Sequence, residues 1–165
     1  MEIFRLDGRC AVVTGGSKGL GLAMARTLSS AGANVVITSR HLAEAESAAH
    51  EIQLAGGNAI GLEADTTDRS ALDQMVDIAN QKFGVIEILV NNAGINIRKP
   101  SLEVDDASWD PVMEINVKGV LMASQAVAPG MIALGRGRII NLGSIMSSVS
   151  LGGRAAYAEF GRAHV

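Results

Sequence analysis

The sequence predicts a Rossmann-type α/β fold with a doubly wound parallel sheet. Helices cover both faces of this sheet, which gives three layers: helices, sheet, helices. Short apolar runs alternate with longer stretches of helical periodicity from residue 10 to residue 90. Three of these runs, AVVT (11–14), VVIT (35–38) and EILV (87–90), are almost continuously apolar. That pattern is typical of strands buried between two layers of helices.

The expected elements follow one another in regular alternation. We expect strands at Cys10–Thr14, Val35–Thr38, Ala59–Leu62 and Ile86–Val90, and helices at Leu20–Ala31, Leu42–Leu54 and Ser70–Phe83. A long helix is expected between Asp106 and Leu134, with Asp105 or Asp106 as its cap and with Pro129 kinking it or ending its first part. Gly135 and Gly137 stop this helix, Arg138–Leu142 forms a fifth strand, and a loop of small residues follows.

Composition indicates one ordered domain and excludes several classes of protein. The 165 residues are 48% hydrophobic and 19% charged, which favours a packed interior. The net charge is −3 with no basic stripe, so we expect no nucleic-acid partner. We expect no membrane span, a cytoplasmic location, and a buried Cys10 that acts as a small apolar group. His41, His50 and His164 lack companions at metal-ligand spacing, so no metal site is expected.

A glycine-rich turn joins the first expected strand to the first expected helix. The stretch TGGSKGLG (14–21) contains Gly15, Gly19 and Gly21. Glycine allows positive φ and lets backbone N–H groups and a helix N-terminus approach a pyrophosphate closely. We therefore expect a Rossmann-type dinucleotide site that includes Gly15, Ser17, Lys18, Gly19, Leu20 and Gly21. The spacing GxxxGxG departs from GxGxxG, so a plain tight turn is the alternative.

The end of the second strand indicates which nicotinamide cofactor fits. An NAD site usually presents Asp or Glu to the ribose 2′-hydroxyl there, and an NADP site presents arginine instead. Here Ser39 and Arg40 follow the strand with no acid beside them. Arg40 and Lys18 suit a 2′-phosphate, so we expect NADP(H) to be favoured over NAD(H). The alternative is that both cations are ordinary solvated side chains.

The turn TGGSKGLG, followed by NNAG (91–94), resembles the short-chain dehydrogenase/reductase family over about Leu6 to Ala158. The chain is similar in type to the 3-oxoacyl-carrier-protein reductases and gluconate 5-dehydrogenases of that family. The resemblance implies a ketone or secondary alcohol as the substrate and a dimer or tetramer as the assembly. It also implies contacts with the cofactor from Asp65, Thr66, Asn91, Ala93 and Gly94.

The resemblance further implies a catalytic group of Asn116, Ser144 and Tyr157. In the family, the asparagine backbone holds a water, the serine polarises the substrate oxygen and the tyrosine exchanges its proton. Each residue has a structural alternative when taken singly. Asn116 reads as a polar helix residue, Ser144 as a loop hydroxyl, Tyr157 as a surface aromatic, and Asp65 as a helix cap.

The family pattern fails where a lysine is due, one helical turn after Tyr157. An unperturbed tyrosine has a pKa of about 10, so a nearby cation is needed to ionise it at neutral pH. The chain has Gly161 at this position, and Arg162 lies about 100° around the helix. We therefore expect impaired catalysis, or else a non-catalytic nucleotide-binding module or inactive fragment.

The resemblance also divides the chain into two parts. We expect residues 1–158 to form an incomplete NADP-binding domain whose last strands are missing, which leaves the fifth strand as an exposed apolar edge. Residues 159–165 form an atypical tail, either frame-shifted, spliced or artificial, or the natural end of a short protein. Assembly into the family's oligomer is in doubt for such a chain.

Overall fold

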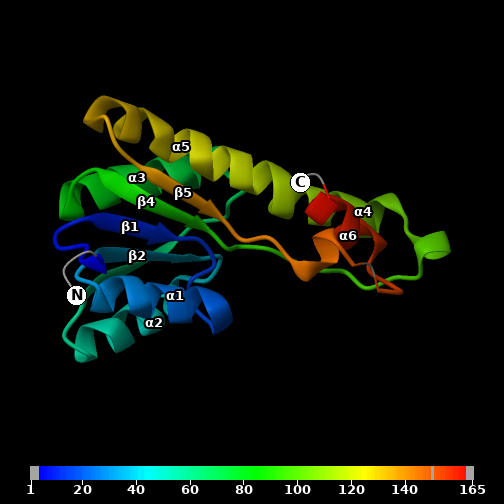
Figure 1. Ribbon diagram of the computed structural model, residues 1–165, viewed down its shortest axis with the longest axis horizontal. Coiled ribbons are helices and arrows are strands. Elements are labelled where there is room, and N and C mark those ends of the chain that lie inside the picture. The colour runs from blue at the N-terminus through cyan, green and yellow to red at the C-terminus, as the bar shows by residue number, and fades with distance from the viewer. Residues whose placement is uncertain (1–3, 150, 163–165) are drawn as a thin grey trace.

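The computed structural model describes residues 4–149 and 151–162. In this part of the chain, five parallel strands form one sheet in the order β3-β2-β1-β4-β5 (Figure 1). The chain winds outward from β1 in both directions, as a doubly wound sheet does. The strands are β1 (Cys10–Val13), β2 (Asn34–Ser39), β3 (Asn58–Glu63), β4 (Ile86–Asn91) and β5 (Arg138–Asn141). The predicted fold class is confirmed.

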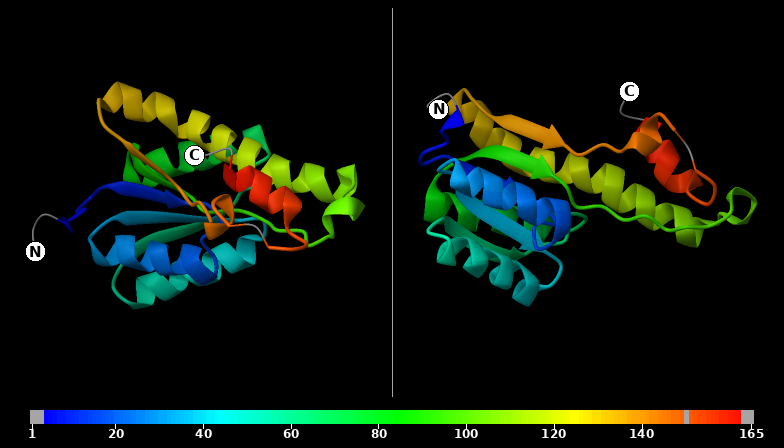
Figure 2. Two further views of the ribbon diagram at one scale, coloured as in Figure 1. Left: turned by 45° about the vertical axis from the view of Figure 1, so that its right-hand side comes forward. Right: turned by 60° about the horizontal axis from the view of Figure 1, so that its bottom comes forward.

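Helices cover both faces of the sheet (Figures 1 and 2). Helices α1 (Gly19–Ser30) and α2 (Leu42–Leu54) lie on one face, and α3 (Arg69–Phe83) and α5 (Gly119–Leu134) lie on the other. These two layers and the sheet between them make the predicted three-layer arrangement.

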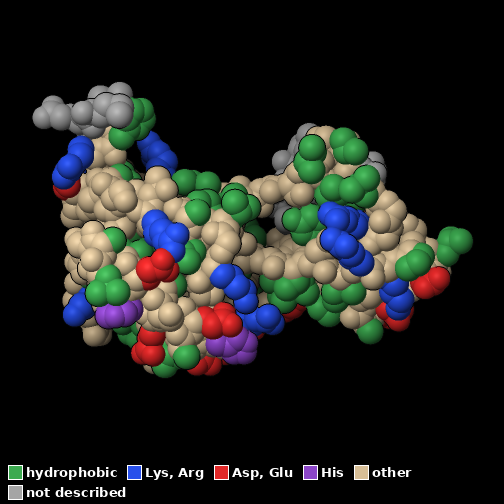
Figure 3. Space-filling view, turned by 90° about the horizontal axis from the view of Figure 1, so that it is seen from below, with side chains coloured by type: hydrophobic (Ala, Val, Ile, Leu, Met, Phe, Trp, Pro, Cys, Tyr) green, Lys and Arg blue, Asp and Glu red, His purple; other side chains and the backbone are tan. Residues whose placement is uncertain are grey.

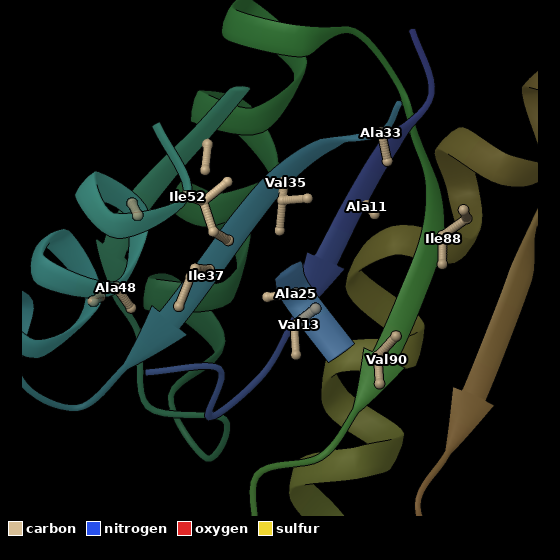
Figure 4. Close-up of a cluster of buried hydrophobic side chains, with 13 residues drawn as sticks. Ala11, Val13, Ala25, Ala33, Val35, Ile37, Ala48, Ile52, Ile88 and Val90 are labelled. Carbon is tan, nitrogen blue, oxygen red and sulfur yellow. The ribbon is translucent and has the colours of Figure 1, made fainter. Parts of the chain in front are cut away.

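Successive residues of β1 enter the two different cores because side chains alternate along a strand. Ala11 and Val13 belong to the cluster under α1 and α2 that Figure 4 shows, whereas Cys10 and Val12 belong to the cluster under α3 and α5. Burial raises the pKa of the Cys10 thiol to about 12. Cys10 is therefore a neutral, packed side chain at physiological pH, as predicted.

The long helical stretch before β5 has three parts. Asp105 caps α4 (Asp106–Met113) through a capping box with Ser108, a π-helical turn covers Glu114–Lys118, and α5 ends at Gly135, whose φ is 71°. Of the two alternatives predicted for Pro129, a kink or an end of the first part of the helix, the end is wrong, because α5 continues past the proline. Buried residues on both sides of the proline, Val127 and Met131, hold that stretch against the same core.

The stretch Asp106–Leu134 is long and apolar enough to cross a bilayer when only length and composition are considered, and it is the one such stretch among the described residues. Core helices of soluble proteins meet the same criterion. Here α5 turns its buried side chains, among them Ala123, Val127 and Met131, toward the sheet.

The strand β5 forms one edge of the sheet. A buried carboxylate ties the entry to this strand to the middle of the sheet, because Glu87 in β4 accepts hydrogen bonds from Arg9 at 2.8 Å and from Arg136 at 2.6 Å and 3.2 Å. Ile139 and Ile140 in β5 are 40% and 48% exposed. The predicted apolar edge is therefore present in the described residues.

After β5 the chain runs beyond the carboxyl ends of the strands and forms a short 3₁₀ turn, η4 (Ile145–Ser147), and the helix α6 (Ala155–Arg162). Helix α6 packs against η4 and α4, and these elements lie side by side at the right of Figure 1. A second 3₁₀ turn, η2 (Ser101–Glu103), precedes α4. The outer part of the molecule is therefore built from two segments that are distant in sequence.

Gly61 in β3 allows α2 to lie against the sheet. A Cβ atom at Gly61 would lie 2.2 Å from the carbonyl carbon of Ala45 in α2, and a backbone atom cannot turn away as a flexible side chain can. We expect Gly61→Ala to lower the free energy of unfolding by about 2 kcal/mol or more, measured by urea denaturation. Gly143→Ala is the matched control, because a Cβ atom there meets nothing within 4 Å. Equal stability of the two variants would contradict this account of the packing.

Candidate cofactor and catalytic site

The turn between β1 and α1 has the conformation that its glycines permit. Gly15 and Gly19 have φ values of 60° and 56°, in the region that disfavours residues with a Cβ atom. A Cβ atom at Gly21 would lie 2.5 Å from the carbonyl oxygen of Gly15 and 2.6 Å from Nδ2 of Asn92. The turn is therefore closed so tightly that only glycine fits at its helical end.

The N-terminus of α1 has no side-chain cap. Lys18 occupies the capping position with extended backbone and makes no capping hydrogen bond, and the first turn contains no acidic residue. Unsatisfied N–H groups and the helix dipole at such a terminus attract anions. Leu20 in this turn is 75% exposed. The turn and the helix end thus offer an anion-binding position at the carboxyl edge of the sheet.

Asn92 fastens this turn to the end of β4. Its Nδ2 donates to the carbonyl oxygens of Thr14 at 2.9 Å and Gly15 at 3.0 Å, and its backbone N–H donates to Oγ1 of Thr14 at 3.0 Å. Sequence reasoning assigned roles to the residues on both sides of Asn92 and missed this one. Nothing local in NNAG distinguishes the amide that reaches back to the first strand.

Asn91 has a different environment from its neighbour. Its Nδ2 donates to Ser124 in α5 at 3.1 Å and to Asn141 in β5 at 2.9 Å. Its Oδ1 is buried and has no hydrogen-bond partner within the described residues. Asn91 therefore joins the sheet to α5 and to the edge strand, and it does not line the cavity described next.

A cavity of about 310 Å³ lies at this edge of the sheet. Figure 3, in which the molecule is seen from below, shows acidic, basic and histidine side chains close together on this face, beside a hollow in the surface. Nine of the predicted cofactor residues line the cavity, and the remaining four, Gly19, Leu20, Gly21 and Asn91, do not. The nine are Gly15, Ser17, Lys18, Ser39, Arg40, Asp65, Thr66, Ala93 and Gly94.

The cavity also contains an acid that sequence reasoning missed. Oε2 of Glu44 accepts from the hydroxyl of Ser17 at 3.2 Å and from that of Ser39 at 3.3 Å, and it lies 3.7 Å from Nζ of Lys18. Desolvation raises the pKa of Glu44, but Lys18, the two hydroxyls and His41 together outweigh it and leave the pKa below its ordinary value. Glu44 is therefore an anion at neutral pH.

Asp65 and Thr66 follow β3 at the same edge. Oδ1 of Asp65 accepts from the N–H and the hydroxyl of Thr67 at 2.9 Å and 2.7 Å, so Asp65 forms a local turn. The alternative prediction that Asp65 caps a helix is wrong, because Asp68 caps α3 by accepting from Ser70 and Ala71. Asp68 holds that position because it directly precedes the first helical residue.

Asn116 lies in the π turn and is 2% exposed. Its amide makes both hydrogen bonds to the backbone of Ile95: Nδ2 donates to the carbonyl at 2.8 Å and Oδ1 accepts from the N–H at 2.8 Å. The side chain therefore holds the segment that follows Gly94. Short π-helical turns of this kind occur frequently at functional sites.

Ser144 and Tyr157 lie in the outer part of the molecule. Ser144 caps η4, and its Oγ accepts from the N–H of Met146 at 3.2 Å. Tyr157 is half-buried in α6, which packs on η4. The two segments are brought together, but Asn116, Ser144 and Tyr157 do not line the 310 Å³ cavity. Helix α6 continues through Gly161.

Within residues 4–149 and 151–162, no three His, Cys, Asp or Glu side chains lie close enough together to hold a metal ion. His164, one of the three histidines considered in the sequence, lies outside the described residues, as does the end of the tail after residue 162.

Comparison with known proteins defines the family. The model of the short chain dehydrogenase family matches residues 9–159. The chain belongs to the short-chain dehydrogenase family. It is 39% identical over 156 residues to gluconate 5-dehydrogenase of Gluconobacter oxydans, covering 94% of this chain and 61% of that protein. It is 37% identical over 153 residues to 3-oxoacyl-[acyl-carrier-protein] reductase of Escherichia coli, covering 92% and 61%.

A solved structure has the same arrangement. The gluconate 5-dehydrogenase of Burkholderia cenocepacia, in complex with NADP and tartrate, superposes with a TM-score of 0.91 at 38% identity, covering 98% of this chain and 63% of that one. This chain therefore spans somewhat less than two thirds of the length of the relatives it matches.

The fastening role of Asn92 can be measured through stability. Asn92→Ala removes the donor that serves the carbonyl oxygens of Thr14 and Gly15, and we expect it to lower the free energy of unfolding by about 1–2 kcal/mol. Asn58→Ala is the control, since the Asn58 amide donates a hydrogen bond to the side chain of Asn34 in an exposed position. Chemical denaturation of both variants checks the difference. A loss at Asn92 no larger than that at Asn58 would refute the role.

Proposed function

We propose that this chain binds NADP(H) in the cavity at the carboxyl edge of the sheet, as the dinucleotide-binding domain of an oxidoreductase that acts on a ketone or a secondary alcohol. The observation that carries the proposal is the glycine turn, which leaves no room for a Cβ atom at Gly21 and opens onto a cavity lined by Lys18, Ser39 and Arg40. A closely approachable backbone beside two cations suits a pyrophosphate and a 2′-phosphate.

The residues present fit three parts of the cofactor. The turn 14–21 and the uncapped end of α1 would hold the pyrophosphate, and Ser39, Arg40 and Lys18 would hold the 2′-phosphate. Asp65, Thr66, Ala93 and Gly94 would contact the adenosine portion. The solved gluconate 5-dehydrogenase, which contains NADP, supports NADP(H) as the cofactor to test first.

When bound, NADP(H) supplies or accepts the hydride. We assign the other tasks to residues of this chain. The hydroxyl of Ser144 holds the substrate oxygen and the hydroxyl of Tyr157 exchanges its proton. Asn116 positions the segment after Gly94 through its two bonds to Ile95. Residue 161 is glycine where the family has a lysine, and on this difference in sequence we propose slow proton exchange in this chain.

We further propose that residues 1–158 act as one domain, with 159–165 as an atypical tail in sequence, and that the protein is cytoplasmic. A small carbonyl or alcohol is the proposed substrate, and a dimer or tetramer is the proposed assembly of the complete family architecture. The second candidate function is a nucleotide-binding module without catalysis. The glycine at residue 161 favours this second candidate, because binding a nucleotide does not require the proton transfer that a lysine would support.

The cofactor preference is tested by charge reversal at Arg40, which is exposed and lines the cavity. We expect Arg40→Asp to weaken NADPH binding by well over about tenfold and NADH binding much less, since only NADPH carries the 2′-phosphate. Titration calorimetry with both dinucleotides measures the two affinities. Arg98→Asp, an equal change at an exposed residue outside the cavity lining, is the control. Equal losses for NADPH and NADH in Arg40→Asp would contradict the NADP assignment.

The catalytic assignment is tested by placing the family's lysine at residue 161. We expect carbonyl-dependent oxidation of NADPH by this chain to be close to background, and Gly161→Lys to raise it by about tenfold or more without reaching the rate of the full-length gluconate 5-dehydrogenase. The double variant Tyr157→Phe, Gly161→Lys is expected to return to background. A gain that survives the loss of the tyrosine hydroxyl would show that the lysine acts by another route.

A further inference from the structure

The carboxylate of Glu44 lies in the cavity among the donors proposed for the 2′-phosphate of NADP(H). One of its carboxylate oxygens, Oε2, accepts hydrogen bonds from the hydroxyls of Ser17 at 3.2 Å and Ser39 at 3.3 Å. The same oxygen lies 3.7 Å from the ammonium group of Lys18. Two hydroxyl donors and a cation around one anionic oxygen are also what a phosphate oxygen needs. Two of the three ligands proposed for the 2′-phosphate, Ser39 and Lys18, are therefore already engaged by an acid of the chain.

The position of Glu44 is fixed by the fold. It lies in the first turn of α2, where an acid is stabilised by the helix dipole, and α2 sits close on β3 because Gly61 has no side chain. Ser39, at the end of β2, is 8% exposed and turns its hydroxyl to Glu44. The carboxylate is thus held over the end of β2, which is where acids select NAD in dinucleotide folds.

We propose that Glu44 is a specificity-determining residue that competes with the 2′-phosphate of NADP(H) for Ser17, Ser39 and Lys18, and so narrows the preference for NADP(H) over NAD(H) set by Arg40. This inference rests on the proposed function. Binding of NADP(H) brings a second anion beside Glu44 and takes over its hydrogen-bond donors. Binding of NAD(H) brings a ribose hydroxyl, which can donate to the same carboxylate.

The experiment uses two small probes of the cavity, adenosine 2′,5′-bisphosphate and adenosine 5′-monophosphate, with dissociation constants from titration calorimetry. Glu44→Gln keeps the shape and a hydrogen-bond acceptor but removes the charge. We expect it to bind the 2′,5′-bisphosphate about tenfold more tightly than the wild type does, and the monophosphate within about twofold of the wild type. NADPH and NADH should show the same change in their ratio.

Glu46→Gln is the matched control. Glu46 lies two residues further along α2, is exposed, and does not line the cavity, so removing its charge alters the net charge equally. We expect the ratio of the two dissociation constants to stay within about twofold of the wild-type ratio. Equal changes in the Glu44 and Glu46 variants would mean that only net charge matters, which overturns the proposal.

A double-mutant cycle with Lys18 separates competition from a purely structural role. Lys18→Met should weaken 2′,5′-bisphosphate binding more in the Glu44→Gln background than in the wild type, because Glu44 no longer neutralises the lysine. Additive effects, or weaker bisphosphate binding by Glu44→Gln, would overturn the proposal while leaving NADP(H) binding intact. If the wild-type chain bound neither NADPH nor NADH, the proposed function and this inference would both be overturned.

Discussion

The contact between the glycine turn and the end of β4 is the constraint on which the rest of the site depends. The amide of Asn92 binds two carbonyl oxygens of the turn, and Gly21 lies so close to that amide that no Cβ atom fits. This contact holds the start of α1 beside the segment after β4. It therefore keeps Ser17 and Lys18 of the turn and Ala93 after β4 on the lining of one cavity.

Because the strands are parallel, charged side chains from several loops meet at one edge of the sheet. Lys18 follows β1, Arg40 and Glu44 follow β2, and Asp65 follows β3. The edge is therefore neither purely cationic nor purely anionic. The side chain of Lys18 is 81% exposed and that of Glu44, its partner, is 41% exposed. The ion pair is therefore solvated, and a ligand can replace either partner at a modest cost in free energy.

The arrangement of strands and helices could be predicted because the apolar runs of β1, β2 and β4 are buried on both faces of the sheet and alternate with stretches of helical periodicity. Other features have no local signal. The hydrogen bonds of Asn92 reach back to the first strand, and the π turn around Asn116 interrupts a stretch whose sequence reads as continuous helix. Glu44 was missed because an acid was sought directly after β2, whereas this one reaches back from the first turn of α2.

The most direct test of the account is to map amide chemical shifts of the isotopically labelled chain by NMR while NADPH is added. The account predicts saturable shifts at the cavity edge, in residues 15–21, 39–44, 64–66 and 92–95. The amide shifts of residues 131–139, from the end of α5 to the start of β5, should not change. Shifts concentrated in that second region, or no saturable shift at the glycine turn, would contradict the central claim that this edge binds the dinucleotide.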